Sequence, residues 1–135
     1  LLFIDKNAKI IDGLLKYKKI NIKNPRWKKL FILFPSKKNL TKKVFDFYKK
    51  NNYIKVKKLN SQNDLLHTSM MLNKEFNNLY NFLDAQKIKF NLKGMSGSGS
   101  SIFISFKSNT AEKHLIKVIR SKYPLVRIEK SYYFS

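Results

Sequence analysis

Two strands and the turn between them are predicted in residues 90–106, which read FNLKGMSGSGSSIFISF. Residues 90–95 are predicted to be extended, and residues 102–106 carry the pattern of a second strand. Between them, residues 96–99 are built from glycine and serine, which are typical turn residues. This stretch is therefore expected to place a flexible loop at the junction of two neighbouring strands.

A helix and a final strand are predicted after residue 106. Pro124 ends the helix, because the residue before a proline is driven out of the helical conformation. Residues 125–134 then return as a strand. Four apolar side chains fall on one face of the helix predicted at residues 110–121, and they are Ala111, Leu115, Val118 and Ile119.

A buried strand is predicted upstream at residues 28–34, where Pro35 ends it because proline cannot donate a hydrogen bond to a sheet. Asn39 or Thr41 can cap a following helix, and Asn63 or Asp64 can cap the next one. A further helix is predicted from about Lys74. Its core-facing stripe is expected to be Phe76, Leu79, Tyr80 and Leu83.

The order of these elements indicates the fold class. From residue 28 onward it is strand, helices, strand, strand, helix, strand, which is the split βαβ pattern of a ferredoxin-like α+β sandwich with one helical insertion. Residues 1–20 add two short extended pieces and an Asp12-Gly13 turn. We place a domain boundary at the linker around residues 21–26, so that residues 1–25 and 26–135 belong to different units.

The composition fits one folded domain. Hydrophobic residues make up 43% of the 135 residues and aromatic residues 14%, enough for a packed core. Cysteine is absent and only His67 and His114 could supply an imidazole, so a metal site is not expected. The longest apolar runs are far shorter than the roughly 20 residues that span a bilayer, and a cytoplasmic protein is expected.

The net charge of +21 allows two interpretations. Lysine and arginine neutralise phosphates, so such a charge is typical of nucleic-acid-binding proteins. However, arginine occurs only at Arg26, Arg120 and Arg127, although its planar fork suits phosphates and bases better than lysine does. Because lysine, asparagine and isoleucine have A/T-rich codons, we favour a compositional origin without a specific nucleic-acid partner.

The glycine-serine run at residues 94–101 is the main candidate for chemistry. It holds three of the four glycines of the chain. Closely spaced glycine and serine let several N–H groups point into one concavity that favours an anion, although a simple flexible hairpin has the same composition. It is neither a Walker A loop nor a dinucleotide-binding turn, since no lysine follows and a strand rather than a helix comes next.

The run resembles the third conserved motif of the GHMP superfamily of small-molecule kinases. Its sequence, Met95 to Ser101 followed by Phe103, is most similar to the motif of those members that act on cytidine-diphospho-methylerythritol in isoprenoid precursor synthesis. Two other places are similar to the same kinases: the Asn63-Asp64-Leu65 segment, and the Phe34-Pro35 pair followed by residues 40–45. The resemblance extends over essentially the whole chain.

This resemblance implies an ATP- and Mg²⁺-dependent phosphotransferase. It implies that residues 1–25 end an N-terminal kinase domain and that residues 26–135 form the C-terminal domain. It also implies a role next to the nucleotide phosphates for Ser96, Gly97, Ser98 and Gly99. No membrane partner is expected.

The kinases' main phosphate loop, catalytic lysine and catalytic aspartate have no counterpart in this sequence. Asp5 lacks the neighbours of the catalytic aspartate and is interpreted as a turn residue. No catalytic residue is therefore assigned, and the chain alone is expected to be inactive. Because it opens without Met, it is expected to be either a processed product or the tail of a longer reading frame. The alternatives are an RNA-binding module, which lacks the expected aromatic sequence motif, and a different GHMP kinase.

Overall fold

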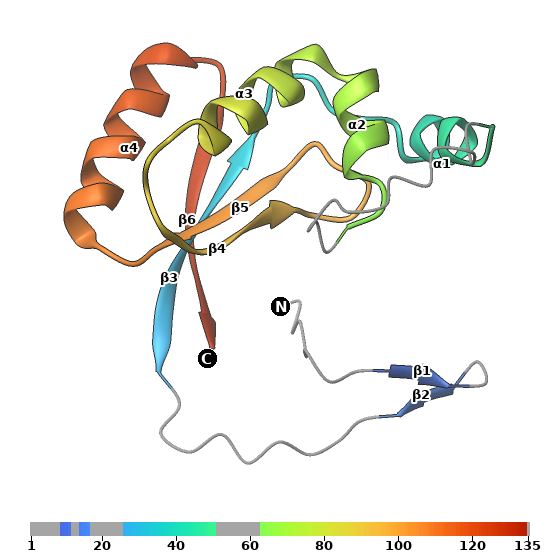
Figure 1. Cartoon of the computed structure of the whole chain (residues 1–135), viewed down its shortest axis with the longest axis horizontal. Coiled ribbons are helices and arrows are strands. Elements are labelled where there is room, and N and C mark those ends of the chain that lie inside the picture. Colours follow the sequence, from blue (N-terminus) through green and yellow to red (C-terminus); the bar gives the residue numbers. More distant parts are fainter. Residues whose placement is uncertain (1–8, 12–13, 17–25, 51–62, 135) are drawn as a thin grey trace.

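A four-stranded antiparallel sheet with helices packed on it is the centre of the molecule, an α+β architecture (Figure 1). The computed structural model describes residues 9–11, 14–16, 26–50 and 63–134. The strands are β3 (Trp27–Phe34), β4 (Phe90–Met95), β5 (Ile102–Phe106) and β6 (Arg127–Phe134). The strands predicted from sequence are thus present, although the last one begins two residues later than expected.

The strand order is β4-β5-β3-β6, with every neighbouring pair antiparallel. β3 pairs with β6 along its whole length and with β5 through three residues centred on the Ile32–Phe103 pair. β3 and β4 are both antiparallel to β5, so they are parallel to each other. β5 and β6 are both antiparallel to β3, so they are parallel to each other as well. Each of these parallel pairs encloses one further strand.

Four helices connect the strands: α1 (Thr41–Lys50), α2 (Leu66–Leu72), α3 (Lys74–Asp84) and α4 (Asn109–Lys122). Among the described elements, α3 and α4 cover the sheet from one side (Figure 1). Asn73 caps α3, because its side chain accepts a hydrogen bond from the Phe76 N–H at 3.0 Å. None of the helices in the described ranges is both long and apolar enough to cross a bilayer.

The core lies between these helices and the covered face of the sheet. Every second residue of the central strands points into it, which is the expected alternation of a half-buried strand. The predicted stripe of α3 is confirmed, since all four side chains are buried. On α4, Ile116 is buried and Val118 only half-buried, so the buried face is rotated from the predicted one. The fully buried apolar residues of the strands are Leu33, Ile102 and Ile104.

The second face of the sheet carries the other set of strand side chains. Leu30, Ile32 and Phe34 of β3 and Phe103 of β5 are half-buried there, outside the core cluster. The ring of Phe103 lies over Gly94, where an added Cβ would stand 2.5 Å from its Cζ atom. In the part of the chain that the structure describes, no helix packs over this face (Figure 1).

The N-terminal part contains a small hairpin, in which β1 (Lys9–Ile11) pairs antiparallel with β2 (Leu14–Lys16). The predicted Asp12-Gly13 turn, Asp5 and the linker at residues 21–25 lie outside the described residues. The division of the chain between residues 25 and 26 stays a prediction.

Candidate functional site

The glycine-serine loop connects β4 to β5 and turns sharply at its two inner glycines. The Ser96 N–H donates to the Ser101 carbonyl at 2.9 Å, and the Gly99 N–H donates to the Ser96 carbonyl at 3.0 Å. Gly97 and Gly99 have φ angles of +56° and +86°. Only glycine adopts this left-handed region without steric cost, so the turn depends on both residues.

Ser98 is the point at which other elements hold the loop. Its carbonyl accepts hydrogen bonds from the Asn39 amide nitrogen at 3.3 Å and from the Ser69 hydroxyl at 2.7 Å. Its own hydroxyl lies 3.0 Å from that of Thr41. The connection after β3, the start of α1 and helix α2 therefore all converge on one loop residue.

Asn63 adds a further brace from the segment before α2. Its amide nitrogen donates to the carbonyls of Met95 at 3.2 Å and Gly97 at 2.8 Å. Its side-chain oxygen accepts from the Leu65 N–H at 3.0 Å. Asn63 thus holds the loop and closes a turn before α2, but the N-cap of α2 is Leu65, without a side-chain cap bond, so the predicted capping by Asn63 or Asp64 is not found.

The hydrogen bonds that hold the loop occupy its carbonyl groups and leave some of its N–H groups available. The carbonyls of Met95, Gly97 and Ser98 all accept side-chain hydrogen bonds. The N–H groups of Gly97 and Ser98 make no hydrogen bond within the described part of the chain. Neighbouring free N–H groups around a left-handed residue form an anion-binding concavity, and the exposed Ser96 hydroxyl lies beside them in sequence. The loop can therefore accept a phosphate edge.

The donor set does not fit a magnesium ion. The groups that hold the loop are amides and hydroxyls, whereas Mg²⁺ is held in proteins chiefly through carboxylates. Within the described ranges, no cluster of three or more His, Cys, Asp or Glu side chains is present. No residue in the described ranges is therefore assigned as a metal ligand.

The connection between β3 and α1 is held by hydrogen bonds to α3 and to the end of the loop. The Glu75 carboxylate accepts hydrogen bonds from the N–H groups of Ser36 and Lys37, both at 3.0 Å, and from the Ser36 hydroxyl at 2.8 Å. The Lys37 carbonyl accepts from the amide of Asn73 at 2.8 Å and the hydroxyl of Ser100 at 2.9 Å. These bonds tie α3, the connection and the end of the loop together.

These bonds favour the charged form of Glu75. Partial burial on its own raises the pKa of the Glu75 carboxyl. The hydrogen bonds from Ser36 and Lys37, together with the nearby Lys37 charge, outweigh that effect and hold the pKa below its ordinary value. The shift extends the charged state of the carboxylate to lower pH, and the carboxylate stabilises the connection in that form.

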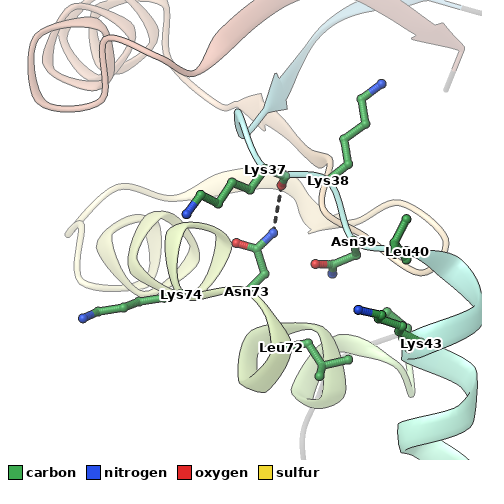
Figure 2. Close-up of a pocket in the computed structure, with 9 residues that line it drawn as sticks. Lys37, Lys38, Asn39, Leu40, Lys43, Leu72, Asn73 and Lys74 are labelled. Carbon is green, nitrogen blue, oxygen red and sulfur yellow. Dashed lines mark hydrogen bonds between the residues drawn. The ribbon is translucent and has the colours of Figure 1, made fainter.

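A pocket of about 390 Å³ opens beside this connection (Figure 2). The β3–α1 connection, the first turn of α1 and the junction of α2 with α3 surround it. Asn39 belongs to both places, because it lines the pocket and donates to the loop at Ser98. The pocket and the loop are therefore neighbours.

The four residues predicted to lie next to phosphates, Ser96, Gly97, Ser98 and Gly99, form this loop together. Sequence reasoning treated Asn39 and Thr41 as helix caps, whereas their side chains hydrogen-bond to Ser98. Ser69 was missed, because a serine inside a predicted helix gives no local sign of a distant partner. No protein family and no curated protein matches this chain in sequence.

Proposed function

We propose that this chain is the C-terminal part of a GHMP-superfamily kinase. The full-length enzyme would use ATP and Mg²⁺ to phosphorylate the 2-hydroxyl of 4-diphosphocytidyl-2-C-methyl-D-erythritol. The chain would contribute Ser96, Gly97, Ser98 and Gly99 as a phosphate-adjacent loop. The catalytic residues would come from outside this chain.

One observation carries this proposal. The three stretches that resemble these kinases are the glycine-serine run, the Asn63 segment and the segment from Phe34 to residue 45, and they are far apart in sequence. In the structure they are joined by hydrogen bonds, through Asn63 to Gly97 and through Thr41 and Asn39 to Ser98. Unrelated local similarities would have no reason to meet at one loop.

The arrangement of the sheet supports the same proposal. Both helix-connected strand pairs, β3 with β4 and β5 with β6, are parallel and enclose one strand. This is the arrangement of a split βαβ unit, so we interpret the domain as ferredoxin-like, in the form used by the C-terminal domain of these kinases.

The role of the loop follows from the chemistry of phosphoryl transfer. That reaction depends mainly on positioning and on stabilising charge at the phosphate oxygens. The free N–H groups of Gly97 and Ser98 suit such oxygens, and their braces keep them in place. When bound, ATP and Mg²⁺ would supply the transferable phosphoryl group and its charge neutralisation.

The test is to extend the reading frame upstream of Leu1 and assay the longer protein. We expect ATP-dependent phosphorylation of the cytidine-diphospho substrate by the longer protein and none by the 135-residue chain. Substrates of other GHMP kinases serve as controls that separate the members of the superfamily. Specific turnover by the isolated chain, or an upstream sequence without a glycine-rich phosphate loop, would overturn the proposal.

A second candidate function is the binding of single-stranded RNA on the uncovered sheet face. Ile32 and Phe103 lie opposite each other on the two central strands there, and single-stranded bases stack on exposed aromatic rings. In this case Phe103→Ala should abolish binding of an RNA oligonucleotide at moderate salt. If binding is instead unchanged by Phe103→Ala and disappears with added salt, the charge alone attracts the RNA.

A further inference from the structure

The lysine-lined pocket beside the β3–α1 connection is a second site of defined chemistry. Lys37, Lys38, Lys43 and Lys74 line it together with the amides of Asn39 and Asn73. Its volume of about 390 Å³ falls in the range of small-molecule sites, which is roughly 300–1,000 Å³. The lysines give the lining positive charge, while the amide nitrogens of Asn39 and Asn73 already donate to the carbonyls of Ser98 and Lys37.

The direction of the side chains singles out one lysine. Figure 2 shows the ammonium group of Lys43 pointing from α1 toward the middle of the pocket. Lys38 and Lys74 extend away from the pocket in the same view. Lys43 is thus positioned to contact a ligand, while the other lysines raise the positive potential around it.

Among the described residues, none of those that line the pocket is acidic. The Glu75 carboxylate of α3 already accepts three hydrogen bonds from Ser36 and Lys37. Its charge offsets that of Lys37 in part, and the carboxylate closest in sequence to Lys43 is Asp46 of α1, which lines the adjoining hollow and not this pocket. The pocket consequently keeps an excess of positive charge.

The start of α1 adds to this potential. The first turn of α1 contains Lys42 and Lys43 and no acidic residue. Lysines at that end of a helix oppose the helix dipole, which favours negative charge there. Leu40, at the N-cap position, has an apolar side chain that cannot accept a hydrogen bond from the first N–H groups. A bound anion would relieve both unfavourable features.

We propose that this pocket binds the diphosphate or triphosphate group of a small molecule. Lys43 would contact the phosphate oxygens directly. The Asn39 amide, whose nitrogen donates to the Ser98 carbonyl, lies at the shared edge of pocket and loop. Kinase activity is not required for this binding, so the site can be tested on the 135-residue chain.

The probe is inorganic pyrophosphate, titrated into the 135-residue chain at low ionic strength and followed by calorimetry and by amide NMR shifts. We expect saturable one-to-one binding, with the largest shifts at the residues that line the pocket. Lys43→Gln should weaken binding about tenfold, the equivalent of one charge-assisted hydrogen bond. Lys43 is exposed, so the variant is expected to fold, and circular dichroism verifies this.

The matched control is Lys49→Gln, which removes the same charge from the last turn of the same helix and does not line the pocket. It should leave pyrophosphate affinity nearly unchanged. Equal weakening by the two variants would overturn the proposal, because it would mean that pyrophosphate responds only to the overall charge. Absence of saturable binding, or binding of an RNA oligonucleotide without binding of pyrophosphate, would overturn it as well.

Discussion

At the scale of single residues, the two glycines of the loop have the same backbone requirement and different surroundings. Both lie in the left-handed region. A Cβ on Gly97 would meet nothing within 4 Å, whereas a Cβ on Gly99 would stand 2.9 Å from the Asn39 amide nitrogen and the Met95 sulfur. It would also stand 3.2 Å from the Ser69 hydroxyl. Gly99 is therefore packed among the side chains that brace Ser98.

This contrast gives a prediction about stability. Gly97→Ala should lower the free energy of unfolding by about 1 kcal/mol, the cost of a left-handed alanine. Gly99→Ala should cost about 2–3 kcal/mol, because crowding adds to the same backbone cost. Urea denaturation of both variants measures the difference. Equal losses would mean that the braces do not close on Gly99 as described.

At the scale of elements, the connection between β3 and α1 owes its position to Glu75. Because the pKa of Glu75 is lowered in the folded protein, its stabilisation is present above the unfolded pKa and is lost as pH falls through the folded pKa. Glu75→Gln should lower the free energy of unfolding by about 1 kcal/mol at neutral pH. The difference from the unmodified chain should shrink below pH about 4.3, the ordinary value for glutamate.

Glu129→Gln is the matched control for this pH dependence. Glu129 pairs with Arg127 at 3.6 Å on the exposed surface, and such pairs contribute little to stability. Chemical denaturation of the three proteins between neutral and acidic pH separates the two carboxylates. A gap for Glu75→Gln that stays constant down to acidic pH would contradict a stabilising charged form.

A comparison of the individual elements also shows which structural features could be predicted from the sequence. Local patterns were sufficient for the strands at β4 and β5 and for the stripe on α3, because burial on one face leaves a period in the sequence. Contacts such as Ser69 to Ser98 could not be predicted this way. They join residues that are distant in sequence through single polar side chains, which have no period. The rotation of α4 that buries Ile116 likewise depends on its packing against β5.

At the scale of the whole molecule, the described sheet has one face in the core and one without a covering helix. The covered face holds Leu33, which is fully buried, whereas Leu30 lies three residues earlier on the opposite face and is half-buried. The same strand thus presents the same residue type to two different environments. The difference in stability lost when each of the two leucines is truncated therefore measures how much the helical layer contributes.

Leu33→Ala and Leu30→Ala therefore form a matched pair that tests the orientation of the sheet. Leu33→Ala should lower the free energy of unfolding by about 2–5 kcal/mol, since it leaves a cavity in a packed core. Leu30→Ala should cost about 1 kcal/mol or less, because a partly exposed leucine loses less buried area. Urea denaturation gives both values. If the two losses are similar, or Leu30→Ala costs more, the face bearing Leu30 is covered as fully as the core, and the uncovered face needed for RNA stacking is absent.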